Sequence, residues 1–183
     1  MNKALAVIFS FLALVFSGCA GSPNTKPPAA DMDAQFRILV EKDKIIEVIN
    51  RLFISTDNRD WSEVKNCFSS EVLFDMTSIA GGEPATLTSQ QIVDAWDQGL
   101  KALKSIHHQA GNYMVNINQG QAEAFCYGIA SHYLPNKTNQ NTRLFVGSYN
   151  FHLTKEVQSW RIDQFKFNLK YIDGNPNLEA EES

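Results

Sequence analysis

Hydrophobic residues in the first half of the chain recur at helical spacing. Over residues 31–57 they return every three or four positions, with charged side chains between them, which predicts a long amphipathic helix. Asp60 is placed to cap a second, short helix over residues 61–68. The run from Thr88 to Gln91 has the form of a capping box and predicts a third helix over residues 89–103.

The second half of the chain instead alternates apolar and polar positions, as β-strands do. After a shorter strand at 72–76, four long strands are predicted, at residues 106–118, 121–133, 142–155 and 159–172. Asn118-Gln119-Gly120 marks a hairpin between the first two. Helices followed by strands predict an α+β fold, in which a curved antiparallel sheet wraps on three helices as a cone-shaped barrel. Such a cone encloses a cavity between the sheet and the first helix.

The N-terminus has the pattern of a targeting segment. Residues 4–16 are apolar apart from Ser10 and follow a single charge at Lys3. This run is too short for a membrane-spanning anchor but fits the core of a secretory signal. We therefore divide the chain into a signal peptide (1–18), a Pro-rich tether (19–30), a folded domain (31–175) and an acidic tail (176–183) that we expect to fray.

The end of the signal, Phe16-Ser17-Gly18-Cys19, resembles a bacterial lipobox. The resemblance implies cleavage before Cys19, lipidation of its thiol and anchoring in the bacterial cell envelope. Ala20 after the cysteine is similar to the pattern that sorts lipoproteins to the outer membrane, facing the periplasm. The alternative is an ordinary cleaved signal followed by a spare cysteine.

Amino-acid composition and net charge argue against some classes of function but do not indicate a reaction. The 183 residues, with 44% hydrophobic and 20% charged side chains, suit one globular domain. The net charge is −4, and removal of residues 1–18 with their one charge makes it −5, which argues against nucleic-acid binding. Cys67 and Cys126 lie in apolar patterns, so we expect buried free thiols more than a disulfide.

Asp57 and a pair of histidines are the first candidates for chemistry. Asp57 falls on the apolar stripe of the first helix, where a carboxylate needs a partner, unless it only satisfies backbone amides at the helix end. His107 and His108 point to opposite faces of their strand. The parity of Tyr113 favours His107 on the cavity side, whereas a bulge at Gly111 would turn His108 inward. The sequence leaves both open.

His132 is the third candidate. It shares a strand face with small residues such as Ala130, which leave room for a ligand or for a closely packed helix. A histidine there can act as a base or as a structural hydrogen-bonding group. His152 is interpreted as a surface or structural residue. In the last strand, the change of parity between Trp160 and Phe165 predicts a bulge near Asp163.

Several segments together resemble the SnoaL-like domain family of the nuclear transport factor 2-like superfamily. The similarity covers about residues 38–173, and the matching segments are 46–61 (IEVINRLFISTDNRDW), 67–76 (CFSSEVLFDM), 107–117 (HHQAGNYMVNI), 121–133 (QAEAFCYGIASHY) and 159–162 (SWRI). Its dehydratase-like members imply catalytic roles for Asp57, His108 and His132. We expect the ligand cavity to be lined by Phe53, Trp96, Tyr113 and Tyr127.

The resemblance leaves two interpretations of function. In one, the domain binds a small hydrophobic or carbonyl-bearing molecule, with or without catalysis. In the other it is a dehydratase- or isomerase-type enzyme whose His–Asp pair removes a proton next to a carbonyl. Leu52 stands where the dehydratases have a tyrosine, which favours the first, although Tyr113, Tyr127 or Tyr149 are candidates to replace it.

The remaining expectations concern partners. By resemblance we expect a homodimer, with no cofactor. A metal site made by two histidines and an aspartate is allowed by ligand type, but no spacing motif supports it.

Overall fold

The computed structural model describes residues 29–157 and 159–179, with side chains from Asp31 onward. The elements are α1 (Ala29–Asp57), α2 (Trp61–Cys67), β1 (Phe68–Asp75), α3 (Thr77–Ala80), β2 (Ala85–Thr88), α4 (Ser89–Leu100), β3 (Ser105–Asn118), β4 (Gln121–Tyr133), β5 (Thr142–Glu156) and β6 (Ser159–Gly174). The predicted signal peptide, Cys19 and most of the tether lie outside the described residues. Among the described helices, none is both long and apolar enough to cross a membrane.

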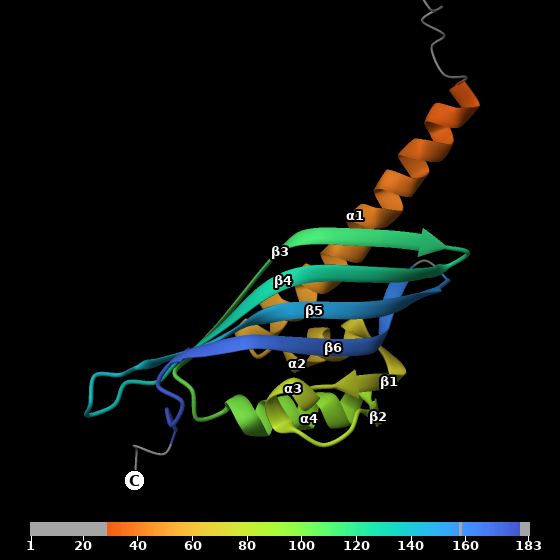
Figure 1. Ribbon diagram of the computed structural model, residues 1–183. Helices are drawn as coiled ribbons and strands as arrows, with labels where there is room; N and C mark the ends of the chain where they lie inside the picture. The colour runs from red at the N-terminus through yellow and green to blue at the C-terminus, as the bar shows by residue number, and fades with distance from the viewer. Residues whose placement is uncertain (1–28, 158, 180–183) are drawn as a thin grey trace, which may run out of the picture.

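The strands form one curved sheet in the order β2-β1-β6-β5-β4-β3 (Figure 1). Its four long strands pair antiparallel, which confirms the predicted α+β fold. In this otherwise antiparallel sheet, β1 runs parallel to β6. Helix α1 packs against β3, and its N-terminal turns extend beyond the sheet (Figure 1).

Local sequence explains the helix boundaries. The Asp60 carboxylate accepts the backbone N–H of Glu63 at 3.2 Å and caps α2, as predicted. Thr88 and Gln91 form the predicted capping box at the start of α4, which ends at Leu100, earlier than expected. The one-turn helix α3 and the short strand β2 flank Gly81-Gly82, where no periodicity had predicted an element.

Two of the register shifts in the sheet affect which of the candidate side chains face inward. In β3 the register shifts between Gly111 and Met114, and Asn112 takes a positive φ of 58°. In β6, Asp163 is the extra residue, because His152 pairs with Gln164 while Leu153 pairs with Ile162. The β6 bulge lies where the change of parity predicted it and lets Trp160 and Phe165 share one buried face, whereas the β3 bulge is one of the two alternatives that the sequence left open.

The core lies between the inner face of the sheet and the helices. Leu52 from α1 packs there with the sheet residues Phe151, Phe165 and Phe167. Cys67 and Cys126 are buried and unpaired, as the apolar pattern predicted.

A second cluster covers the end of the sheet, where Leu178 is fully buried with Leu103, Ile106 and Leu134. The expectation of a frayed tail is therefore wrong as far as Glu179, because Leu178 finds an apolar socket.

Candidate functional site

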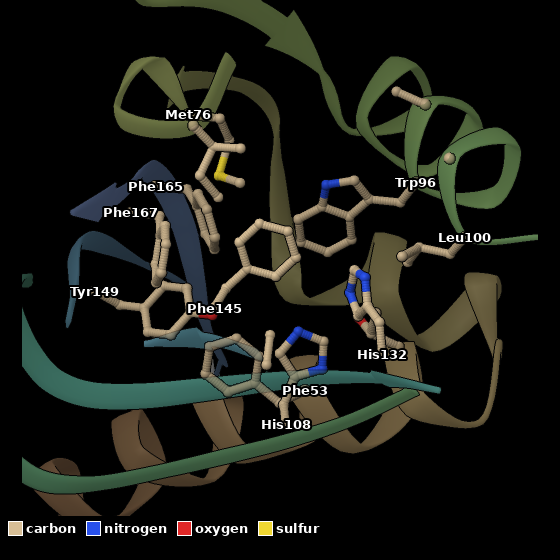
Figure 2. A pocket seen from close by; sticks show the side chains of 15 residues that line it. Phe53, Met76, Trp96, Leu100, His108, His132, Phe145, Tyr149, Phe165 and Phe167 are labelled. Carbon is tan, nitrogen blue, oxygen red and sulfur yellow. The ribbon is translucent and has the colours of Figure 1, made fainter. Parts of the chain in front are cut away.

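A cavity of about 240 Å³ opens between the helices and the inner face of the sheet (Figure 2). Its walls are mostly aromatic and aliphatic, while its polar groups are few. Figure 2 shows the rings of His108 and His132 projecting into it from β3 and β4. The lining residues are Phe53, Thr56, Met76, Ile79, Ala95, Trp96, Gly99, Leu100, His108, Ala130, His132, Phe145, Tyr149, Phe165 and Phe167.

Asp57 and His108 form a closely bonded pair at the edge of this cavity. The Asp57 Oδ1 and His108 Nδ1 atoms are 2.6 Å apart, and their side chains are 16% and 13% exposed. The same carboxylate accepts the backbone N–H of His108, at 2.9 and 3.1 Å. A carboxylate accepts hydrogen bonds, so Nδ1 carries the proton, and the Nε2 atom of the neutral ring keeps its lone pair.

The β3 bulge settles which of the two histidines faces the cavity. His108 lies inward and stacks on Phe53 with ring centroids 5.1 Å apart. His107 is 72% exposed, and its Nδ1 atom lies 3.7 Å from Asp57. Of the two alternatives that the sequence left open, the structure has the bulge, with Asn112 rather than Gly111 in the left-handed conformation.

His132 lies in the same cavity wall, but its partner is cationic. The Nη2 atom of Arg143 is 3.2 Å from His132 Nδ1. A guanidinium has no acceptor, so this nitrogen accepts and the ring proton resides on Nε2. Arg143 is held in turn by Glu179, whose Oε2 accepts from Nη1 at 2.7 Å. His132 is thus placed to donate a hydrogen bond, whereas His108 is placed to accept one.

The environment of His132 opposes its protonation. Burial lowers the pKa of His132 to about 4, and the positive charge of Arg143 adds to this effect. For Glu179, burial is the largest influence and raises the pKa, but the hydrogen bonds from Arg143, a backbone hydrogen bond and the positive charge of Arg143 together leave the pKa below its ordinary value. At neutral pH the site therefore contains a neutral His132 between an ion pair and an apolar cavity.

Tyr149 contributes a further polar side chain to the cavity wall. Its ring packs between Phe53 and Phe167, at centroid distances of 4.8 and 4.7 Å. The close approach depends on Gly128, because a Cβ atom there would lie 2.2 Å from the Tyr149 ring. Burial raises the pKa of Tyr149, so its hydroxyl stays protonated. Of the tyrosines considered as replacements for Leu52, this one lines the cavity.

The predicted lining residues divide evenly. Phe53 and Trp96 line the cavity, as expected. The assignments of Tyr113 and Tyr127 to the lining are wrong. The Tyr113 hydroxyl donates to Asn50 away from the cavity. Tyr127 lies on the outer face, 46% exposed, with Lys170 Nζ 4.1 Å from its ring centroid.

Arg143 and Glu179 are not among the residues predicted from the sequence. The first had a signal, because Arg143 has the same parity as Phe145 and Tyr149 and so lies on the inner face of β5. Glu179 had none, since nothing local shows that a tail residue returns to the sheet. Among the described residues, no cluster of three or more metal-ligating side chains is present.

The chain is similar to proteins of known fold. The model of the SnoaL-like domain family matches residues 37–166. A search among curated proteins finds no match. A Kribbella flavida protein is 21% identical, with a TM-score of 0.72 over 74% of this chain and 95% of that one. An NTF2-like protein with a cystatin-like fold from Novosphingobium aromaticivorans is 17% identical, with a TM-score of 0.65 over 86% and 98%.

An enzyme is also among the similar structures. The hexachlorocyclohexane dehydrochlorinase of Novosphingobium barchaimii is 10% identical, with a TM-score of 0.63 over 78% of this chain and 94% of that one. At such low identity these likenesses concern the fold and not the reaction.

Proposed function

The chain belongs to the SnoaL-like domain family. From that premise we propose that it binds a small, largely apolar carbonyl compound and catalyses proton transfer at the carbon next to the carbonyl. The observation that carries the proposal is the 2.6 Å contact between Asp57 and His108, whose ring lines the cavity while Asp57 lies behind it. Such a pair is a general-base arrangement, because the carboxylate fixes the ring and stabilises the cation that forms when the ring takes a proton.

The reaction step follows from the two tautomers. The His108 Nε2 atom takes a proton from the carbon next to the carbonyl, and the electron pair of that C–H bond moves toward the carbonyl oxygen as an enolate. Hydrogen bonds from His132 Nε2–H and the Tyr149 hydroxyl stabilise the charge on this oxygen. His108 then returns its proton, either to another carbon, which gives an isomer, or to a departing hydroxide, which leaves as water.

Hydrogen–deuterium exchange tests this proposal on a panel of candidate carbonyl compounds. Apolar ketones and esters that fit about 240 Å³ would be screened for binding by thermal shift. Those that bind would be incubated in D₂O with the wild type and with Asp57→Asn. Deuterium at the carbon next to the carbonyl, seen by mass spectrometry and dependent on Asp57, supports the proposal. Ligands that bind without enzyme-dependent exchange would overturn the catalytic part.

A binding function without catalysis is the second candidate. It is favoured by Leu52, which stands where the related dehydratases have a tyrosine and is fully buried in the core. It is also favoured by the mostly apolar cavity wall, which suits retention of a hydrophobic molecule. The exchange experiment separates the candidates, since a carrier protects a bound carbonyl compound and does not exchange its protons.

We also propose that the domain is lipid-anchored through Cys19 in the bacterial cell envelope, at the outer membrane facing the periplasm. The apolar run of residues 4–16 and the lipobox-like sequence before Cys19 support this location. A Cys19→Ser variant should move the protein from the membrane fraction to the soluble fraction. Unchanged membrane association of the variant would refute the anchor.

A homodimer through the outer face of the sheet is proposed as well. The support is the exposed Tyr127, Ile129 and Met114 on that face, which are 46%, 38% and 69% accessible. Light scattering should give twice the mass of one chain, and Ile129→Lys should reduce it to that of a monomer. A monomeric wild type at micromolar concentration would refute the proposal.

A further inference from the structure

Arg143 lies between the cavity histidine and the C-terminal tail. Its Nη2 atom is 3.2 Å from His132 Nδ1, and its Nη1 atom donates to Glu179 Oε2 at 2.7 Å. We propose that Arg143 and Glu179 are positioning residues that hold His132 in the Nε2–H tautomer, so that it presents a hydrogen-bond donor to an oxygen atom of the bound molecule. The tail is then part of the site, and this inference rests on the proposed function.

The guanidinium is fixed from several sides. Glu179 contacts it with both carboxylate oxygens, and the Pro176 carbonyl accepts from Nη1 at 3.3 Å. The ring of Phe145 lies below it, with its centroid 5.1 Å from the Arg143 Cζ atom. Leu178, fully buried, holds the tail in place beside Glu179. A donor restrained in this way has little freedom to leave His132 Nδ1.

Charged and titratable groups reach His132 from every element around it. Arg143 on β5 and His108 on β3 oppose a positive charge on the ring, while Glu179 in the tail and Asp57 on α1 favour one. Arg143 is the group in hydrogen-bond contact, and it donates to Nδ1. Since protonation of Nδ1 would break that contact and place two cations together, the ring stays neutral with Nε2–H directed away from Arg143.

This arrangement selects the chemistry of the ligand. A neutral oxygen acceptor, such as a carbonyl or a hydroxyl, accepts from His132 Nε2–H at no electrostatic cost. An ammonium group has no lone pair to accept this hydrogen bond and would lie near the Arg143 cation. The site is therefore suited to a ligand with a neutral or partly negative oxygen atom and excludes amines. The polar group of the ligand is thus a carbonyl or a hydroxyl.

Nitrogen NMR of the full chain tests the inference without any substrate. In protein labelled with ¹⁵N-histidine at pH 7, we expect an unprotonated Nδ1 and a protonated Nε2 for His132. In Arg143→Met, which keeps the side-chain bulk but removes the donor and the charge, the two nitrogen signals should move toward each other. The pKa of His132 should then rise above about 4 but stay below its ordinary value, because burial, the larger cause of the lowering, remains. Glu179→Gln, which leaves Leu178 in its socket, should move both signals the same way by a smaller amount.

Controls make the outcomes decisive. Glu156→Gln removes a carboxylate from the Arg161–Glu156 pair, whose N–O distance is 4.0 Å, and should leave the His132 signals unchanged. Arg143→Met combined with Glu179→Gln removes the unpaired carboxylate if the single variant does not fold. A protonated Nδ1 in the wild type, or signals unchanged in Arg143→Met, would overturn the inference. Absence of proton exchange with a fixed tautomer would refute the proposed function alone.

Discussion

His108 and His132 occupy the same cavity wall on neighbouring strands but differ in their partners. His108 Nδ1 meets the Asp57 carboxylate at 2.6 Å, and His132 Nδ1 meets the Arg143 guanidinium at 3.2 Å. An anionic partner makes the first Nδ1 a donor, and a cationic partner makes the second an acceptor. One residue type thus supplies a hydrogen-bond acceptor and a hydrogen-bond donor in one pocket, because the partner of each Nδ1 atom decides the tautomer of its ring.

The difference extends to how each partner is held. Asp57 ends the long helix α1, and its carboxylate is bound to the β3 backbone, so the His108 side is fixed by two large elements. Arg143 is held by Glu179, five residues after the end of β6. The acceptor side of the pocket is therefore built into the main fold, whereas the donor side depends on a short docked tail.

Replacement of Asp57 by Asn should have the largest effect, since it removes the difference between the two histidines. An amide can donate to His108 Nδ1, which would leave the proton on Nε2 and turn the base into a second donor. We expect deuterium exchange to slow by about 10³–10⁴-fold, the order seen when an aspartate that orients a catalytic histidine becomes Asn. The rate would be measured on the ketone that exchanges fastest with the wild type.

Asp60→Asn is the matched control for this change. Asp60 caps α2, and Asn caps a helix about as well, so exchange and stability should stay close to the wild type. Equal rates in Asp57→Asn and Asp60→Asn would show that the carboxylate does not support a base.

Weakening the apolar contact that holds the C-terminal tail should disturb the contacts of Arg143 with Glu179 and His132. It should leave the Asp57–His108 pair intact. Leu178 is fully buried, and Leu178→Ala should lower the free energy of unfolding by about 2–4 kcal/mol in urea titration. Leu39→Ala on the 63% exposed surface of α1 should change it by less than about 0.5 kcal/mol. A Leu178→Ala variant as stable as Leu39→Ala would mean that the tail does not dock.

The pH dependence of stability reports the buried environment of His132. The pKa of His132 is lowered to about 4 in the folded state, from an ordinary value near 6.5. Below pH 6.5 the unfolded chain therefore binds the proton first, and stability falls as the pH drops from 6.5 to 4. The loss by pH 4.5 should be on the order of 2–3 kcal/mol.

The same titration in His132→Gln should lack most of this fall, whereas exposed His107→Gln should retain it. Glu41, with a pKa lowered to about 2 chiefly by its hydrogen bond with Lys155, contributes stability that is lost only below about pH 4.5. Its effect therefore follows that of His132. A His132→Gln curve that matches the wild type between pH 6.5 and 4.5 would contradict the lowered pKa.

The helices, the long strands and the Asp57 side of the site could be predicted from the sequence. Periodicity predicted α1 and the long strands because their apolar faces are regular, and the placement of Asp57 on the buried stripe followed from that. Arg143 shares its parity with Phe145, but its link to Glu179 depends on a chain reversal beyond Gly174. Such a contact joins residues 36 apart and leaves no local pattern.

Tyr113 and Tyr127 show a second reason for failure. Both are predicted to line the cavity, yet Tyr127 lies on the strand face opposite the inward stripe of Ala130 and His132. The alternation of strand faces by itself excludes Tyr127 from the cavity lining. Tyr113 lies just after the β3 bulge, and its hydroxyl turns to Asn50 on α1 instead of the cavity. Strand direction gives the face of a residue, but its partner depends on what packs there.

The smallest expected effect is on stability, from substitutions in the β3 bulge that turns His108 and not His107 toward the cavity. Asn112 has a φ of 58°, a conformation that Asn and Gly adopt readily and β-branched residues avoid. Asn112→Val should lower the free energy of unfolding by about 1–2 kcal/mol, whereas Asn112→Gly should leave it nearly unchanged. Urea titration measures both, and the His108 ring signals in NMR report whether the Asp57 contact persists. If Val and Gly are tolerated equally, the inward position of His108 does not depend on the left-handed residue, and the rest of the β3–β4 register must hold it.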